Sequence, residues 1–79
     1  MNTPRVELLR LGFRIRAART ALGYSQGGFA AVCGLSREAV AGVERGERDV
    51  TFLVLCTLCA TLGCDVAALT QGLPEITPR

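Results

Sequence analysis

The feature of this sequence that most limits its fold is a pair of serines, Ser25 and Ser36, each followed by a short run suited to a helix. A serine at such a position can accept a hydrogen bond from an unpaired backbone N–H in the first helical turn. The residues between the two serines suffice for two helical turns and a tight corner at Gly34. The sequence therefore predicts two short helices, about 26–33 and 37–45, that meet at a steep angle.

Two short helices in this arrangement form a helix-turn-helix, whose second helix enters the major groove of DNA. Within the second helix, Val40 and Val43 are expected to be buried, and Gly46 supplies a left-handed cap after its end. Its outer side begins with long polar side chains and continues with small ones: Arg37, Glu38, Ala41 and Gly42. Such a face can settle into a groove while its first side chains reach outward. The motif, about 25–46, therefore predicts DNA binding.

Size and composition favour one small folded domain, 1–79, with a short tail at about 72–79. The chain has 79 residues, of which 49% are hydrophobic and 20% are charged. This composition allows a hydrophobic core, and it is too apolar for a chain that is disordered throughout. No apolar run approaches the roughly 20 residues needed to cross a bilayer, and the N-terminus lacks a signal-peptide pattern. We therefore expect a soluble, cytoplasmic protein that binds no membrane.

Charge is divided unevenly along the chain, although the formal net charge is only +2. Residues 1–48 contain eight arginines and four glutamates, a net charge of +4. Residues 49–79 contain one arginine and three acidic residues, a net charge of −2. A basic half beside an acidic half is typical of a protein that turns one face to a polyanion and another to itself or a partner.

Three further helices complete an all-α, compact five-helix bundle. Thr3 and Pro4 are expected to open the first helix, which stops at Gly23. Thr51 caps a helix that ends at Gly63, and Asp65 caps a short last helix that reaches about Thr70. The positions expected to face the core are Leu8, Leu11, Ile15, Ala18 and Leu22 in the first helix, Phe29 and Ala30 in the second, and Phe52, Leu55, Leu58, Cys59 and Leu62 in the fourth.

Gly27 and Gly28 weaken the first turn of the helix at 26–33, since glycine costs up to about 1 kcal/mol relative to alanine in a helix interior. Two interpretations stay open. The glycines let backbone N–H groups approach a phosphate closely, or a frayed turn is simply tolerated.

Apolar residues also lie on helix faces that the core does not need. Val6, Leu9 and Phe13 form a second stripe on the first helix, which we expect to contact the segment around Leu73 and Ile76; a self-association surface is the alternative. The outer side of the fourth helix is apolar as well, and several such residues together indicate a covered patch. We expect a dimer interface there, formed by Leu53, Cys56, Ala60, Val66, Leu69 and Leu73.

The four cysteines are interpreted as small core residues rather than as metal ligands or disulfides. Cys56 and Cys59 lie inside an apolar helical run, and Cys33 and Cys64 flank glycines. Zinc sites usually place a Cys-x-x-Cys pair on a turn, and this chain has no histidine and no second pair. Free cysteine behaves as a small hydrophobic residue. We therefore expect no metal and no cofactor, with a metal- or redox-sensing role as the alternative.

The pattern as a whole resembles the helix-turn-helix domains of Cro and lambda-type phage repressors, the XRE family. The matching residues are Arg19, Ser25-Gln26, Phe29-Ala30, Gly34-Leu35-Ser36, Val43-Glu44-Arg45-Gly46 and Leu62-Gly63. Within that family, the spacing of Arg37, Gly42, Glu44-Arg45-Gly46 and Arg48 looks like that of restriction–modification controller proteins. The resemblance implies an ion pair between Arg19 and Glu44, and we expect the buried form of this pair rather than two exposed charges.

The expected DNA contacts divide into those that read bases and those that hold the phosphate backbone. Arg37 is expected to reach guanine O6 and N7. Glu38 either accepts from a cytosine amine or merely offsets the charge of Arg37, and Ala41 is placed to meet a thymine methyl group. The expected phosphate contacts, which the resemblance also implies for the first two, are Gln26, Ser36, Arg45 and Arg48.

These observations favour a sequence-specific transcriptional regulator that binds a palindromic or near-palindromic operator as a homodimer, with half-sites about 34 Å apart. Control of its own gene and of a restriction–modification system is the expected use. The alternatives are an antitoxin or a phage-type repressor with the same fold, and contact with a toxin or with RNA polymerase is a further expected partnership. Catalysis is not expected, because the chain has no histidine, no paired-carboxylate cleft and no phosphate-binding glycine loop.

Overall fold

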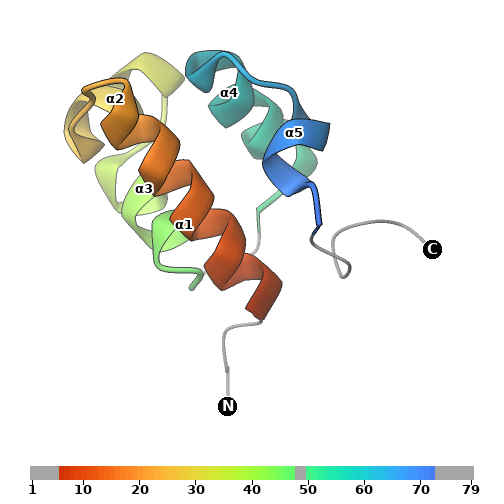
Figure 1. The fold of residues 1–79 in the computed structure, drawn as a ribbon. Helices are drawn as coiled ribbons and strands as arrows, with labels where there is room; N and C mark the ends of the chain where they lie inside the picture. Colours follow the sequence, from red (N-terminus) through yellow and green to blue (C-terminus); the bar gives the residue numbers. More distant parts are fainter. Residues whose placement is uncertain (1–5, 48–49, 73–79) are drawn as a thin grey trace.

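The computed structural model describes residues 6–47 and 50–72, and five α-helices make up its regular structure. The helices are α1 (Val6–Ala21), α2 (Gln26–Cys33), α3 (Arg37–Glu44), α4 (Phe52–Leu62) and α5 (Val66–Thr70). The described ranges contain no strand, so the predicted all-α five-helix fold is confirmed. In Figure 1, α2 and α3 lie on one side of α1, and α4 and α5 lie on the other.

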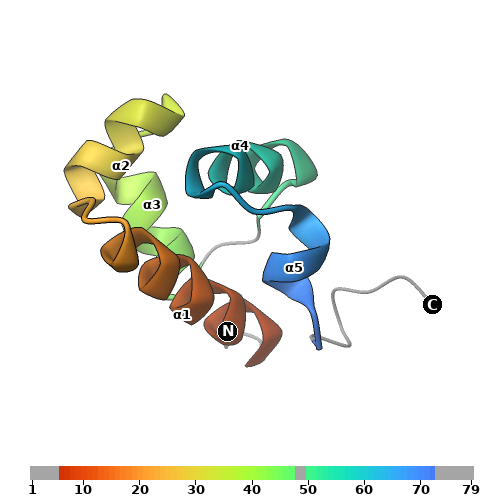
Figure 2. The same cartoon turned by 45° about the horizontal axis from the view of Figure 1, so that its top comes forward.

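The hydrophobic core forms where α1, α2, α3 and α4 meet. Phe29, Ile15, Leu58 and Val40 are its largest fully buried side chains, and they come one from each of these four helices. The short α5 packs against both α1 and α4, as Figure 2 shows, and contributes Leu69 to the same core. Each helix thus buries one face in a common centre, and the opposite face of α3 is left free.

The helix starts follow the predicted caps. The side chains of Ser25, Ser36, Thr51 and Asp65 each accept a hydrogen bond from the backbone N–H three residues later. Between α2 and α3, Gly34 takes a left-handed backbone conformation with φ of 73°, and the Leu35 N–H donates to the carbonyl of Ala30. This glycine-centred end of α2 allows the chain to turn directly into α3.

Two core assignments made from periodicity and one surface assignment are wrong in the structure. Leu22 is 54% exposed, because α1 ends at Ala21 and the helical phase no longer applies to the next residue. Phe52 is 70% exposed, since it is the first residue of α4 and lies a full turn before Leu55, the first buried position. Gly42, expected on the outer side of α3, is buried.

The expected cap of α1 at Thr3 and Pro4 lies outside the described residues. Across the described parts of the chain, none of the helices has the length and apolar character required for a membrane span.

Candidate nucleic-acid interface

The first turn of α3 presents its polar side chains to solvent. Ser36 caps the helix by accepting a hydrogen bond from the N–H of Ala39 at 3.0 Å. Arg37 and Glu38 follow at once, and both are exposed. Val40, one of the next residues, is fully buried. The helix is therefore held from behind by the core, while its N-terminal side chains are free to meet a ligand.

The far end of α3 is fixed by a buried ion pair between Arg19 of α1 and Glu44. The Nε of Arg19 lies 2.6 Å from Glu44 Oε2, and its Nη2 lies 3.1 Å from Oε1, so the two groups meet in a bidentate arrangement. The side chains are only 8% and 3% exposed, respectively. Arg19 also donates through Nη1 to the carbonyl of Tyr24 at 2.7 Å. One guanidinium thus ties the end of α1, the following loop and α3 together.

Gln26 joins the same network. Its Nε2 donates to Glu44 Oε1 at 3.1 Å, and the residue is half-buried at the start of α2. We expected Gln26 to contact phosphate, whereas in the free protein its amide links α2 to α3. The sequence offers no signal for this contact, since the two residues are far apart in the chain and neither lies on a periodic face.

The other expected phosphate-contacting residues lie at the two ends of α3. Ser36 is exposed, and its hydroxyl is already the cap of the helix. Arg45 is exposed just past the end of α3, and its Nε lies 3.0 Å from Glu47 Oε2. The hydrogen bond from Arg45 to Glu47 raises the pKa of the guanidinium, so Arg45 remains a cation. Arg48 lies outside the described residues.

Comparison with known proteins identifies the arrangement. The sequence profile of the helix-turn-helix family matches residues 15–69, which include α2, α3 and both partners of the buried ion pair. The chain belongs to this family. None of the curated proteins matches this helix-turn-helix chain.

Solved structures of gene regulators resemble this helix-turn-helix protein closely. The restriction–modification controller protein C.AhdI from Aeromonas hydrophila is 38% identical, with a TM-score of 0.79, over 82% of this chain and 98% of that chain. The clp gene regulator ClgR from C. glutamicum is 23% identical, with a TM-score of 0.81, over 95% and 96% of the two chains. The family match and the 38% identity to C.AhdI support a DNA-binding regulator of the controller type, whereas the likeness to ClgR shows the shared fold.

A third neighbour was solved together with DNA. It is the controller protein C.Esp1396I, a tetramer in complex with its natural 35-base-pair operator. It is 24% identical to this helix-turn-helix protein, with a TM-score of 0.77, and the match covers 90% of this chain and 93% of that chain. At this identity the likeness shows the shared fold.

The residues expected to form a dimer interface fall into three groups. Leu53 and Ala60 of α4 are exposed, and Cys56 and Val66 are half-buried. Leu69 is 6% exposed and belongs to the core of its own chain, so the expectation that it lies in an interface is wrong. Its position on the inner face of the short α5 explains the difference. Leu73 lies outside the described residues.

The remaining expected base contact, Ala41, is half-buried on α3. Among the cysteines, burial raises the pKa of the Cys59 thiol to about 11, with a smaller contribution from the neighbouring Cys64. Such a thiol stays protonated near neutral pH. Within residues 6–47 and 50–72, no group of three or more metal-ligating side chains is close enough to hold an ion.

Proposed function

We propose that this protein binds a palindromic or near-palindromic DNA operator as a homodimer and regulates transcription of its own gene and of a restriction–modification system. The observation that carries the proposal is the pairing of an exposed first turn of α3 with a buried anchor at its other end. The exposed turn offers Arg37 and Glu38, and the anchor is the Arg19–Glu44 ion pair. The likeness to the controller protein C.AhdI, at 38% identity, supports the choice of regulated genes.

The roles proposed for the α3 residues follow from their chemistry. The planar fork of Arg37 matches the O6 and N7 acceptors of guanine, and one good bidentate contact contributes roughly 1–3 kcal/mol of discrimination. Glu38 is an acceptor for a cytosine amine, and Ala41 offers a methyl surface to thymine. Arg45 lies at the C-terminal end of α3. It is proposed to leave its ion pair with Glu47 when DNA binds and to neutralise a phosphate instead.

Gln26 and Ser36 are proposed to keep their phosphate contacts alongside their internal ones. Ser36 uses its hydroxyl oxygen as an acceptor inside the protein, so the hydroxyl hydrogen is available to a phosphate. Gln26 donates one amide hydrogen to Glu44, and its second amide hydrogen is available in the same way.

Dimerisation is proposed to use the outer side of α4 together with the start of α5. Leu53 is 77% exposed and Phe52 is 70% exposed, so two adjacent large apolar side chains at the start of α4 face solvent. With Cys56, Ala60 and Val66 they form the apolar surface that a second copy would cover. The tetramer that C.Esp1396I forms on its operator supports assembly on DNA for this chain as well.

A binding experiment with two arginine variants tests the proposed reading of DNA. An operator is selected from a random pool with the wild-type protein, and affinities for it and for shuffled DNA are measured by fluorescence anisotropy at several salt concentrations. Arg37→Ala and Arg45→Ala each remove one exposed positive charge from an end of α3, so they are matched in charge. Arg37→Ala should reduce the preference for the operator over shuffled DNA. Arg45→Ala should lower the affinity for both DNAs equally and make the affinity depend less steeply on salt concentration. Equal effects of the two variants on both DNAs would contradict the proposal.

The proposed dimer is tested separately by sedimentation equilibrium. Leu53→Asp should shift the protein to a monomer, because it places a charge in the surface that dimerisation buries. Val32→Asp is the matched control, since Val32 is also an exposed apolar residue, at 59%, but lies on α2. A wild-type protein that remains monomeric at all concentrations, or a dimer that Leu53→Asp leaves intact, would overturn this part.

A further inference from the structure

The outer face of α1 carries a shallow apolar groove. Its cavity, of about 260 Å³, is lined by Val6, Leu9, Arg10, Phe13 and Arg14. Val6 and Phe13 are 59% and 71% exposed, so two large apolar side chains of this groove face solvent. The segment around Leu73 and Ile76, which we expected to contact this face, lies outside the described residues. Grouped exposed apolar residues usually mark a surface to which a partner binds.

The exposed apolar residues form one stripe along α1. Val6 and Phe13 are seven residues apart, about two helical turns, so they lie on the same side of the helix. Ala17 follows Phe13 after one more turn and is also exposed. From Val6 to Ala17 the helix rises about 16 Å, at 1.5 Å per residue. The stripe formed by Val6, Phe13 and Ala17 is therefore long enough to support about three turns of a partner helix.

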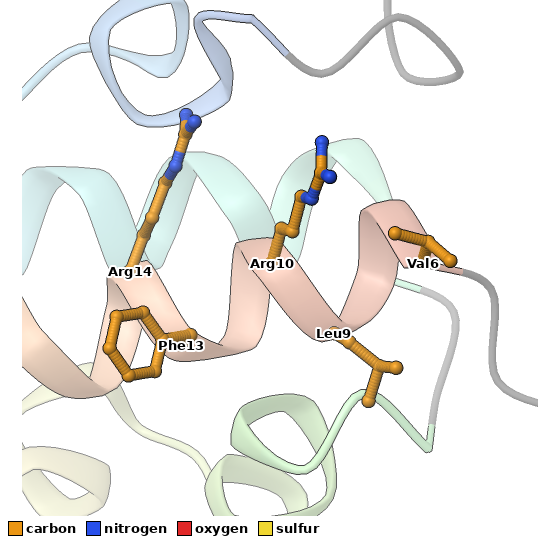
Figure 3. A pocket seen from close by; sticks show the side chains of 5 residues that line it. All are labelled: Val6, Leu9, Arg10, Phe13 and Arg14. Carbon is orange, nitrogen blue, oxygen red and sulfur yellow. The ribbon is translucent and has the colours of Figure 1, made fainter.

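Arginines border this stripe on both sides. Figure 3 shows Arg10 and Arg14 extending to the side on which α5 lies, and Leu9 pointing to the opposite side, toward the segment that follows α3. Leu9 meets that segment at Gly46, where an added Cβ would lie 2.8 Å from Leu9 Cδ2. Arg16 lies seven residues after Leu9 and is exposed, so it borders the same second edge. The stripe therefore runs between guanidinium groups on either side.

The charges that border the stripe are all positive. The one acidic residue of α1, Glu7, is buried, at 7% exposure. Arg14 is half-buried, and its Nη1 donates to two backbone carbonyl oxygens at the end of α5, at 2.9 and 2.6 Å. A carbonyl carries no net charge, so Arg14 keeps its positive charge while α5 fixes its position. Arg10 and Arg16 are exposed. The outer face of α1 therefore attracts a negatively charged partner.

Neither a second copy of this chain nor DNA fits this face well. Two copies related by a twofold axis would pack α1 against α1, so the arginines of one copy would meet those of the other. Like charges that face each other across an interface weaken it. DNA would pair with the arginines, but its phosphate surface would leave the apolar stripe in contact with water. The occupant needs apolar side chains and carboxylates together.

We propose that the outer face of α1 binds an acidic amphipathic helix of another protein. The apolar side of the partner helix covers the stripe, as in other complexes in which a helix lies in a hydrophobic groove. Its carboxylates pair with Arg10 on one edge and Arg16 on the other, where the guanidinium groups can form bidentate contacts. The site is separate from the dimer surface proposed on α4 and from the first turn of α3.

The test is a peptide-binding experiment on the full chain. The probe is a synthetic peptide of about 14 residues, with leucines alternately three and four positions apart and glutamates beside them. A lactam bridge on its far side holds it helical, because so short a helix is marginal in water. The control peptide has lysine at every glutamate position. In fluorescence anisotropy, the wild type should bind the acidic peptide and should not bind the lysine peptide.

Two sets of variants locate the binding site. Phe13→Ser should lower the affinity for the acidic peptide about tenfold or more, because one phenyl ring is no longer buried by the partner. Since Phe13 is largely exposed in the free protein, the variant should fold normally. Val32→Ser is the matched control, because Val32 is an exposed apolar residue of α2, and it should retain the affinity. Arg10→Glu combined with Arg16→Glu should reverse the preference between the two peptides.

Several outcomes would overturn the proposal. These are a wild type that fails to bind the acidic peptide, equal binding of the two peptides, and unchanged binding in Phe13→Ser. A dimer that Phe13→Ser dissociates in sedimentation equilibrium would make a second copy the occupant. A loss of affinity for shuffled DNA in the same variant would make DNA the occupant. The peptide measurements contain no DNA, so their result is independent of the proposed operator binding.

Discussion

Gly12 in α1 lies directly against the end of α3, so that a Cβ atom on Gly12 would come within 2.5 Å of the carbonyl oxygen of Glu44. The carbonyl of Val43 would be equally close. Both obstacles are backbone atoms, which cannot rotate away as a side chain would. Helix α3 is therefore seated on α1 by two contacts at its C-terminal end, the close approach at Gly12 and the Arg19–Glu44 ion pair.

Replacement of Gly12 by alanine should consequently destabilise the protein, although alanine is the better helix former. We expect the free energy of unfolding to fall by about 1–3 kcal/mol, the usual cost of overpacking, because α1 and α3 must move apart. Gly27→Ala is the control, since nothing lies within 4 Å of the added atom. It should raise the free energy of unfolding by up to about 1 kcal/mol. Urea unfolding followed by circular dichroism measures the free energy of unfolding of both variants. An unchanged value in Gly12→Ala would show that α1 and α3 approach each other less closely at this point.

Removing one partner of the Arg19–Glu44 pair should be costly. Glu44→Ala leaves a guanidinium that is only 8% exposed without its bidentate partner, and we expect the free energy of unfolding to fall by about 3–5 kcal/mol. Glu47→Ala breaks the exposed pair with Arg45 and should leave stability almost unchanged. The two variants are compared by thermal and urea unfolding. Equal effects would mean that burial of the Arg19–Glu44 pair does not determine its contribution.

The elevated pKa of Cys59 predicts a loss of stability in alkaline solution. The folded pKa is about 11, above the ordinary value of 9.0, so the unfolded chain loses the thiol proton first as pH rises. The stabilisation is therefore complete below pH 9 and is lost as the pH rises from 9 to 11. Urea unfolding gives the free energy of unfolding of the wild type and of Cys59→Ala at each pH. The difference between the two proteins should stay constant at pH 7 to 8 and should change above pH 9. A difference in the free energy of unfolding that stays constant up to pH 11 would contradict the raised pKa of Cys59.

Local signals predicted the helices well, because each cap depends on a few neighbouring residues. Ser25, Ser36, Thr51 and Asp65 cap the helices at the positions expected from the sequence. The glycine corner at Gly34 follows from the same local chemistry. Such contacts join residues three to five positions apart, and the sequence displays them directly.

Contacts between helices were less predictable. Periodicity indicates which face of a helix is apolar, but it does not say how far the core extends along the helix, and so it placed Phe52 inside. The bond from Gln26 to Glu44 and the close approach at Gly12 depend on how α1 and α2 pack on α3. The Arg19–Glu44 pairing came from family resemblance, since spacing alone does not bring these residues together.

The central claim, that Arg37 reads a guanine, is tested most directly by changing one atom of the DNA. Each guanine of the selected operator is replaced in turn by 7-deazaguanine, which lacks the N7 acceptor, and affinities are measured for the wild type and for Arg37→Ala. The wild type should lose about 1 kcal/mol or more of binding free energy at one guanine in each half-site, and Arg37→Ala should lose nothing further there. An equal loss in both proteins, or no sensitive guanine in the wild type, would contradict the assignment of Arg37 to base recognition.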